Sequence, residues 1–248
     1  MKTIVDNLAV EYMDEGSGAV VLMLHGWGNN LHSFDGLIKK LDDRRIIRLD
    51  LPGFGGSELP KNAWAISDYA LFVKAFIEKI SISPDVIVGH SMGGRVAIEG
   101  TARGLFAPRK LVLIASAGGA QRKNVRNYLY LVVAKIGKII TSVPPLRYWR
   151  ASMRKRLYAA AESDYYDAGP LRETFKKTVN EDITPIAQTL AIPALLIWGA
   201  EDTTTPISQG QKLHGAIENS KLEILDNCDH FVHQQQPEEV VRLIKDFI

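Results

Sequence analysis

Apolar and polar positions along most of this chain form a pattern that predicts short strands separated by helices. Six apolar runs predict strands, at Val20–Leu24, Ile46–Leu49, Val86–Val88, Leu111–Ala115, Ala194–Trp198 and Leu222–Leu225. Four longer segments between them predict helices, at Ile66–Ile80, Met92–Arg103, Ile207–His214 and Pro237–Ile248. Strands and helices in alternation indicate an α/β fold, with a mostly parallel sheet, helices on both faces, and ligands bound beyond the carboxyl ends of the strands.

The alternation stops between residues 117 and 184. This stretch follows the predicted strand Leu111–Ala115 and predicts several helices, with breaks at Pro144-Pro145 and Gly169-Pro170. We therefore expect a single domain whose core consists of residues 1–116 and 185–248, with residues 117–184 as an inserted helical segment.

Composition places the chain among globular proteins that bury a sizeable core. It has 248 residues, of which 46% are apolar and 23% charged. A single cysteine, Cys228, excludes an internal disulfide and fits a reducing compartment. Residues Met1–Val10 lack the apolar stretch of a signal peptide, and no run reaches the roughly 18 apolar residues of a membrane span. We expect a cytoplasmic protein with no membrane span.

Charge is distributed unevenly along the chain. The net charge is +2, yet the segment Gly119–Ala161 holds ten Lys or Arg and no Asp or Glu, which leaves 20 basic and 28 acidic residues elsewhere. One interpretation is a solvated charged surface. The other is a docking site for an anionic partner, such as a carboxylate-bearing substrate, an acidic acyl carrier or an anionic membrane surface. No nucleic-acid-binding motif accompanies the basic residues, so we expect no nucleic-acid partner.

The segment Gly89-His90-Ser91-Met92-Gly93 places a serine between two glycines, after a predicted strand and before a predicted helix. A tight strand-to-helix turn holds such a serine exposed beside a base and strains its backbone. A side chain two residues before or after the serine would collide with neighbouring backbone, which glycine avoids. Ser91 is therefore a candidate nucleophile.

Three further features follow predicted strands. The first strand ends in His25-Gly26-Trp27-Gly28, a turn that can aim a backbone N–H at the oxygen of a carbonyl under attack. Asp202 follows the strand Ala194–Trp198, and His230 follows the last strand. The chain order is thus Ser, Asp, His, with the acid and the base each just past the end of a late strand.

Together these motifs resemble the alpha/beta-hydrolase superfamily, in particular small bacterial serine esterases with a helical lid. The resemblance runs from roughly residue 11 to the C-terminus and rests on His25-Gly26-Trp27-Gly28, Asp50-Leu51-Pro52-Gly53-Phe54-Gly55-Gly56-Ser57, Gly89-His90-Ser91-Met92-Gly93-Gly94, Trp198-Gly199-Ala200-Glu201-Asp202 and His230-Phe231.

The resemblance implies a role for each of these residues and needs no cofactor. Ser91 would attack an acyl carbon, His230 would take its proton, and Asp202 would orient the imidazole and stabilise its charged form. The backbone N–H groups of Trp27 and Met92 would bind the oxyanion. Residues 117–184 occupy the position of a cap over the active site.

The acid and the base each have a rival in the sequence. Glu201 precedes Asp202, and His233 follows His230, but the family pattern matches at Asp202 and His230. Cys228 is close to His230, although its loop has no nucleophile-elbow pattern.

Other polar residues near these motifs have structural interpretations. We expect Asp226 and Asp229 to be solvated loop residues, His25 and His90 to pack and form hydrogen bonds, and Asp50 to organise the glycine-rich turn that follows it. No His or Cys spacing typical of a metal site occurs, so no metal is expected.

Ester hydrolysis by a serine nucleophile is the leading functional prediction. In epoxide hydrolases and haloalkane dehalogenases of the resembling fold, Asp replaces the serine, so Ser91 argues against both. A serine triad is compatible with carbon–carbon bond hydrolysis of dienoate-type substrates, with lipid or thioester hydrolysis and with cofactor-free peracid formation. Some proteins of this fold keep the triad and act as ligand receptors or signalling partners. The sequence does not define the acyl or the alcohol group.

Overall fold

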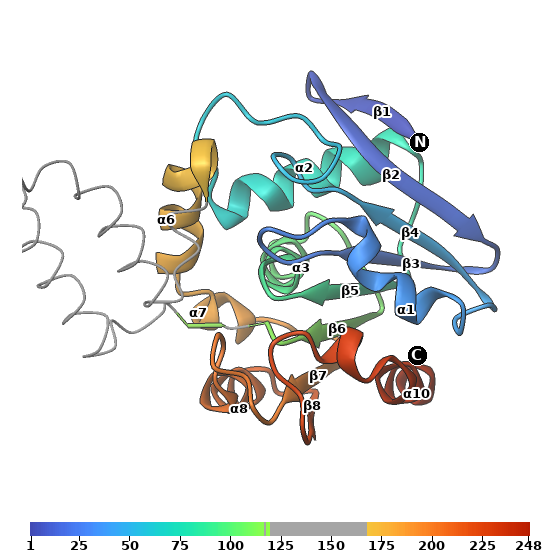
Figure 1. Cartoon of the computed structure of the whole chain (residues 1–248), viewed down its shortest axis with the longest axis vertical. Helices are drawn as coiled ribbons and strands as arrows, with labels where there is room; N and C mark the ends of the chain where they lie inside the picture. Colours follow the sequence, from blue (N-terminus) through green and yellow to red (C-terminus); the bar gives the residue numbers. More distant parts are fainter. Residues whose placement is uncertain (117, 120–167) are drawn as a thin grey trace, which may run out of the picture. The chain divides into compact units, whose positions relative to one another are not determined.

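A computed structural model describes residues 1–116, 118–119 and 168–248 (Figure 1). The chain divides into two compact units, one of Met1–Ala120 with Glu181–Ile248 and the other of Gln121–Asn180. In the second unit the described elements are the 3-10 helix η3 (Gly169–Leu171) and α6 (Arg172–Asn180). The remaining elements all belong to the first unit, which contains every candidate catalytic residue.

The first unit is built on a sheet of eight strands in the order β1-β2-β4-β3-β5-β6-β7-β8. The strands are β1 (Lys2–Val5), β2 (Leu8–Gly16), β3 (Ala19–Leu24), β4 (Arg44–Leu49), β5 (Val86–His90), β6 (Lys110–Ile114), β7 (Ala194–Gly199) and β8 (Ser220–Leu225). From β4 to β8 along the sheet all pairings are parallel, whereas β2 runs antiparallel to both of its neighbours. The carboxyl ends of β3 to β8 therefore meet at one edge of the sheet.

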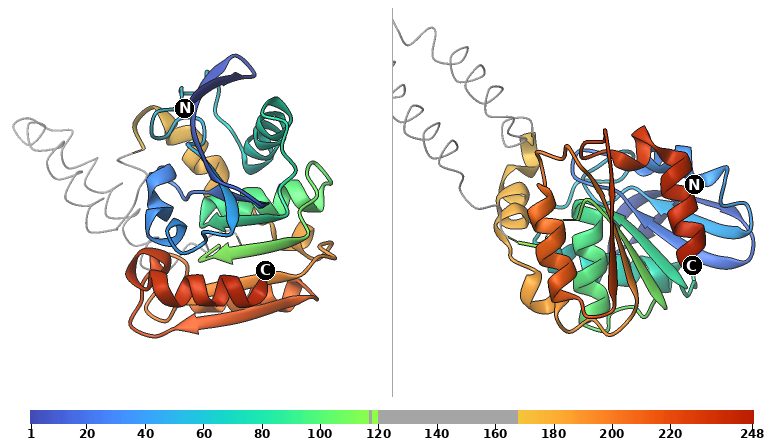
Figure 2. Two further views of the ribbon diagram at one scale, coloured as in Figure 1. Left: turned by 90° about the vertical axis from the view of Figure 1, so that its right-hand side faces the viewer. Right: turned by 90° about the horizontal axis from the view of Figure 1, so that it is seen from below.

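Helices cover both faces of this sheet (Figure 2). One layer contains α1 (Asp35–Ile38), α9 (Val232–Gln235) and α10 (Pro237–Phe247), which contact one another, next to the 3-10 helix η1 (Leu31–Phe34). The other layer contains α2 (Ile66–Lys79), α3 (Met92–Ala102), α7 (Thr184–Ala187) and α8 (Ile207–Ala216). This arrangement confirms the predicted α/β fold.

Alternate residues of the central strands pack against the α1, α9 and α10 layer. They form one buried cluster with the apolar face of α10, whose members include Val21, Met23, Val86, Val88, Val112, Ile114, Leu195, Ile197, Val240 and Ile244. Residues between them, such as Leu22, Ile87 and Leu196, are also fully buried. Strands buried on both faces are apolar at every position, which is why the sequence shows them as continuous runs.

All six predicted strands and all four predicted helices are present, with boundaries that differ by a few residues. Ala115 was predicted to end a strand, but β6 ends at Ile114 because Ala115 has a φ of 49°. The sequence-based prediction missed β1 and β2, which lie at the antiparallel edge of the sheet. Most residues of both strands are at least partly exposed, so they do not form an apolar run.

Two predictions concern residues that are largely outside the described part of the chain. Of the predicted insertion at 117–184, the structure describes 118–119 and 168–184, and its role as a cap stays a prediction. All ten basic residues of Gly119–Ala161 lie outside the described residues. Among the helices that the structure does describe, none is both long enough and apolar enough to span a bilayer.

Candidate active site

Ser91 occupies the turn between β5 and α3, with φ 49° and ψ −114°. A positive φ is unfavourable for a residue with a side chain and marks stored backbone strain. Two hydrogen bonds hold the turn, from Ser91 N–H to the Ile114 carbonyl at 2.9 Å and from Arg95 N–H to the Ser91 carbonyl at 3.2 Å. The structure thus shows the strained strand-to-helix turn that the sequence predicts.

The glycines on either side of Ser91 allow backbone segments to approach closely. A Cβ atom on Gly89 would lie 2.4 Å from the Cα of Gly94, and one on Gly93 would lie 2.0 Å from the carbonyl oxygen of Leu24. Both distances are far below van der Waals contact, and both obstacles are main-chain atoms that cannot rotate away. The spacing of glycines around the serine therefore has a direct steric cause.

His230 and Asp202 come together from the ends of neighbouring strands. Asp202 lies after β7 and His230 after β8, and His230 Nδ1 is 2.9 Å from Asp202 Oδ2. The Asp202 side chain is fully buried, and that of His230 is 10% exposed. A proton on Nδ1 that is donated to the carboxylate leaves Nε2 with its lone pair free to accept a proton. Glu201, the rival acid, is exposed.

Thr205 also binds the Asp202 carboxylate, and the sequence interpretation missed it. Its backbone N–H donates to Asp202 Oδ1 at 2.7 Å, and its hydroxyl donates to Oδ2 at 2.7 Å. An Asp whose side chain accepts the N–H of the residue three positions later is a common local turn. The Asp-x-x-Thr spacing before a predicted helix was the available signal.

His90 connects the serine turn to the loop that carries His230. Its Nε2–H donates to the backbone carbonyl of His230 at 3.0 Å, and the two rings are 4.9 Å apart. Burial lowers the pKa of His90 well below its ordinary value, and the neighbouring histidines His233 and His230 lower it further. His90 is therefore neutral, and its hydrogen bond connects the residue before Ser91 to the loop that carries His230.

His233, the alternative base in the sequence, is buried among aromatic rings and has no contact with Asp202 among those the structure describes. It is 1% exposed, its ring lies 4.4 Å from that of His90 and 5.4 Å from that of Phe34, and burial lowers its pKa to about 3. Neither ring nitrogen has a hydrogen-bond partner among the residues that the structure describes. The carboxylate of Asp202 binds His230 instead.

The turn after β3 lies against the serine. A Cβ atom on Gly26 would be 3.1 Å from the Cβ of Ser91, so the main chain that leads into Trp27 passes beside the Ser91 side chain. Met92 begins α3 directly after Ser91, and its N–H belongs to the positive end of that helix. This placement suits the predicted oxyanion-binding role of the Trp27 and Met92 N–H groups, which stays a prediction.

His25 uses both of its ring nitrogens within this turn. Its Nδ1 lies 2.8 Å from the carbonyl oxygen of Gly26, and its Nε2 accepts the Leu51 N–H at 2.9 Å. The second contact requires a bare Nε2, so Nδ1 carries the proton and donates it to Gly26. His25 is thus a structural residue, in agreement with the prediction.

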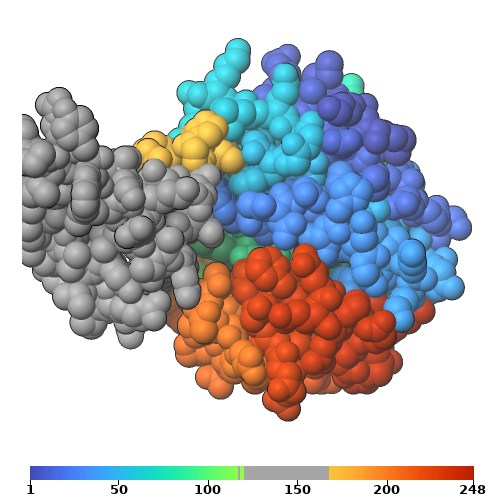
Figure 3. Space-filling model, viewed as in Figure 1, coloured from blue at the N-terminus to red at the C-terminus, as the bar shows by residue number. Residues whose placement is uncertain are grey.

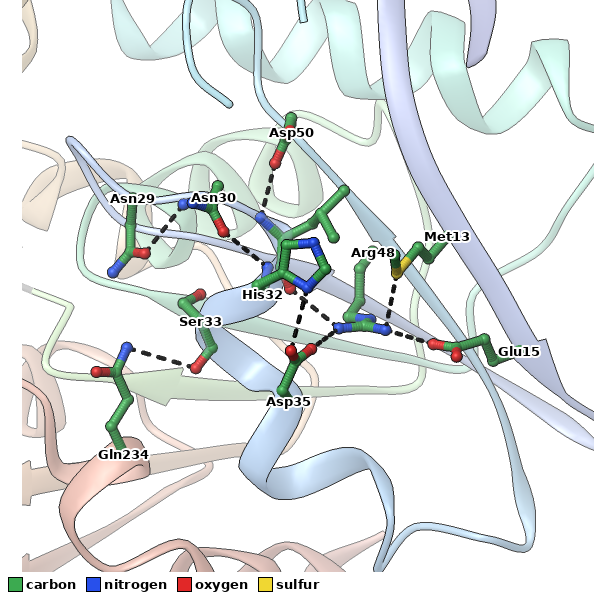
Figure 4. A network of polar contacts seen from close by, with 11 residues as sticks. Met13, Glu15, Asn29, Asn30, His32, Ser33, Asp35, Arg48, Asp50 and Gln234 are labelled. Carbon is green, nitrogen blue, oxygen red and sulfur yellow. Dashed lines mark hydrogen bonds and ion pairs between the residues drawn. The ribbon is translucent and has the colours of Figure 1, made fainter. Parts of the chain in front are cut away.

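A polar network fixes the loop that follows the turn (Figure 4). Asp50 Oδ1 accepts the Leu31 N–H at 2.7 Å, while the buried Arg48 donates to the Leu31 carbonyl at 3.2 Å and pairs with Glu15 and Asp35. Arg48 and Asp50, at the end of β4, therefore bind the backbone carbonyl and the backbone N–H of Leu31.

Asp50 also organises the glycine-rich turn that follows it, as predicted. Its Oδ2 accepts the Gly56 N–H at 2.7 Å, and its backbone carbonyl accepts the Ser57 hydroxyl at 2.7 Å. Both carboxylate oxygens of Asp50 thus accept backbone N–H groups, which is a structural role.

No group of three or more His, Cys, Asp or Glu in the described ranges is arranged to hold a metal ion. Cys228 is buried, and desolvation together with nearby carboxylates raises the pKa of its thiol, which disfavours the nucleophilic thiolate.

In the space-filling view, the green part of the chain, to which β5 and α3 belong, is visible in a hollow between the blue and red parts (Figure 3).

Comparison with known proteins gives a consistent picture. A family model described as the alpha/beta hydrolase family matches residues 21–243. An uncharacterised hydrolase of Bacillus subtilis, YugF, is 26% identical over 98% of this chain and 94% of its own length.

Two further proteins that resemble this chain have named activities. A 2-hydroxy-6-oxononadienedioate/2-hydroxy-6-oxononatrienedioate hydrolase of Escherichia coli is 24% identical over 97% of this chain and 91% of that protein. An esterase from Exiguobacterium antarcticum has a solved structure that covers all of this chain, with 99% of its own length covered, a TM-score of 0.77 and 20% identity. At 20% identity, this structural similarity shows that the fold is shared and nothing more.

Proposed function

The chain belongs to the alpha/beta hydrolase family, and on that premise we propose that it is a serine hydrolase that cleaves carboxylic esters through an acyl-enzyme intermediate. The observation that supports this most is the strained Ser91 turn beside a buried His230–Asp202 hydrogen bond of 2.9 Å. His90, the residue before Ser91, donates to the main chain of His230 at 3.0 Å, so the turn and the base loop are in direct contact.

The proposed reaction uses these groups in the following order. His230 Nε2 takes the proton of the Ser91 hydroxyl while the oxygen attacks the carbonyl carbon of the ester. Asp202 stabilises the imidazolium that forms, and the N–H groups of Trp27 and Met92 bind the negative oxygen of the tetrahedral intermediate. His230 then gives its proton to the departing alcohol, which leaves an acyl group on Ser91. A water molecule, deprotonated by His230, attacks that acyl group, and His230 then returns the proton to the Ser91 oxygen as the bond to the acyl group breaks and the acid is released.

A carbon–carbon bond hydrolase is the second candidate. It is favoured by the similarity to the Escherichia coli hydrolase of an oxo-dienedioate, which covers nearly the whole chain. Both reactions need a base and a bound oxyanion, so the same residues would serve either. The two proposals differ in substrate and not in the arrangement of the site.

The test compares substrate classes with purified protein. Wild type should hydrolyse p-nitrophenyl esters of two to eight acyl carbons, the best of them at more than a few turnovers per second. Ser91→Ala should lose about 10⁴-fold or more in kcat, because the nucleophile is absent. Cleavage of a 2-hydroxy-6-oxo-dienoate with no ester turnover would favour the second candidate. An ester activity that Ser91→Ala retains would refute both.

A further inference from the structure

Thr205 is a buried residue next to the proposed acid, Asp202. It is 6% exposed and lies between Asp202 and the start of α8. Its backbone N–H donates to Asp202 Oδ1 at 2.7 Å, and its backbone carbonyl accepts the Trp198 indole N–H at 2.7 Å. With both backbone polar groups bound, the position of the Thr205 hydroxyl is set by the fold.

The hydroxyl of Thr205 reaches three polar atoms. It is 2.7 Å from Asp202 Oδ2, 3.2 Å from the Ala115 carbonyl oxygen and 3.2 Å from His230 Nδ1. A hydroxyl has one proton to donate and two lone pairs to accept with. The shortest contact is to a carboxylate, and hydrogen bonds to a charged acceptor are the stronger ones. The proton therefore belongs on the bond to Asp202.

Asp202 Oδ2 consequently accepts two hydrogen bonds, one from Thr205 and one from His230 Nδ1 at 2.9 Å. A carboxylate oxygen that already accepts a proton donor carries less negative charge toward its other partner. The Thr205 hydroxyl thus reduces the attraction between Asp202 and a protonated His230. The lone pair of the hydroxyl also faces His230 Nδ1, but at 3.2 Å this contact is longer and weaker than the 2.7 Å bond to the carboxylate.

Other ionisable groups near His230 leave Asp202 as its main charged neighbour. From β5, His90 faces the ring of His230, and from α9, His233 lies behind His90; burial lowers the pKa of both histidines, so both are neutral. On the loops, Asp229 and Glu201 are exposed, and Asp229 Oδ1 accepts the Phe231 N–H at 2.8 Å.

We propose that Thr205 is a positioning residue of the acid–base pair. Its hydroxyl holds the Asp202 carboxylate in place and weakens the attraction of that carboxylate for the protonated His230. The proposal rests on the proposed function of Ser91, Asp202 and His230. Its consequence is that removal of the hydroxyl should strengthen the attraction of Asp202 for a protonated His230.

Thr205→Val tests this, since valine keeps the shape and removes the hydroxyl. The acid limb of the kcat/KM profile should move upward by about 0.5 to 1 pH unit, where one unit is a tenfold change in the stability of the protonated form. The plateau kcat should fall by about threefold to tenfold with KM unchanged, because Asp202 loses one of its supports. Thr205→Ser, which keeps the hydroxyl, should follow wild type.

Thr204→Val is the matched control, because Thr204 lies in the same turn but is exposed. A Thr205→Val profile that overlays those of wild type and Thr204→Val would overturn the proposal. So would a Thr205→Ser profile displaced like that of Thr205→Val, since packing and not the hydroxyl would then be responsible. If Thr205→Val does not fold, as judged by thermal unfolding, Thr205→Ala provides the same comparison.

An NMR titration separates this proposal from the proposed function. The Cε1 proton of His230, identified by its loss in His230→Gln, should titrate at a higher pH in Thr205→Val than in wild type, whether or not an ester is hydrolysed. Ser91→Ala that remains active would refute the proposed function alone. Equal titration midpoints for His230 in wild type and Thr205→Val would refute the role of Thr205 alone.

Discussion

The side chains of the proposed acid and base differ from their sequence neighbours in burial and in hydrogen bonding. The carboxylate of Asp202 is buried and satisfied by Thr205 and His230, while Glu201 next to it is exposed. A buried carboxylate needs such partners to remain charged. The difference between the adjacent acids is therefore one of environment, and it can be tested by substitution.

We expect His230→Ala to reduce kcat by about 10⁴-fold to 10⁶-fold, as much as loss of the nucleophile, because residues that act as a unit fail together. Asp202→Asn should be severe but about tenfold to hundredfold less damaging. Glu201→Gln, the matched control for the acid, should stay within about threefold of wild type. Steady-state kinetics on one p-nitrophenyl ester decide the order, and an inactive Glu201→Gln beside an active Asp202→Asn would reverse the assignment.

Sequence reasoning reached Asp202 and His230 because a triad follows the chain order of strand ends. It did not reach Thr205 or the bond from His90 to the His230 carbonyl. The Thr205 contact lies within the loop after β7, where the Asp-x-x-Thr spacing was its only signal, whereas the His90 bond depends on how segments from two strands pack. Neither contact leaves a periodic pattern. Local spacing predicted the candidate site residues, whereas the contact between His90 and the His230 carbonyl is determined by tertiary packing.

At the scale of elements, the serine turn is a close contact between β3, β5 and α3. Gly93 lies at the start of α3, where a Cβ atom would be 2.0 Å from the Leu24 carbonyl oxygen of β3. The helix can begin directly under the sheet only because this position has no side chain. The same steric logic made the turn predictable from its glycines.

Gly93→Ala should therefore lower the free energy of unfolding by about 2 kcal/mol or more and abolish most activity, because backbone must move. Gly215→Ala in α8 is the matched control, since a Cβ atom there would meet nothing within 4 Å. It should raise stability by about 0.5 kcal/mol. Urea unfolding of both variants measures the contrast, and equal midpoints would contradict the steric account of the turn.

Elements with both faces buried were the most predictable from sequence. All five residues of β5 are buried, so its apolar character is evident. In contrast, most residues of β2, at the antiparallel edge, are partly buried and form no apolar run. The four-residue helices α1 and α9 are too short to show helical periodicity. These elements follow from the packing of the sheet rather than from their own sequence.

For the whole molecule, buried neutral histidines make stability depend on pH. Burial lowers the pKa of His233 to about 3, and it lowers the pKa values of His90 and His25 as well. The unfolded chain binds protons on these residues below its ordinary histidine pKa of about 6.5, whereas the folded protein does not. Their effect on stability is thus absent above about pH 6.5 and becomes an increasing loss as the pH falls toward 3.

His233→Phe should reduce this acid sensitivity, because phenylalanine fills a similar space beside Phe34 without a titratable group. Between pH 6.5 and 5, wild type should lose about 2 kcal/mol more unfolding free energy than the variant. Chemical unfolding at several pH values measures the difference. Above pH 7 the two curves should run parallel, and curves that stay parallel down to pH 5 would show that His233 is not a buried neutral histidine.

Covalent labelling of the intact protein with a fluorophosphonate, followed by peptide mass spectrometry, tests most directly whether Ser91 is a nucleophile activated by this fold. Such reagents react with a serine that a neighbouring base activates, and leave unactivated hydroxyls untouched. We expect one adduct per chain, on the peptide that contains Ser91, with no adduct in Ser91→Ala and much slower labelling in His230→Ala. An adduct at another residue, or equal labelling of wild type and Ser91→Ala, would contradict the assignment.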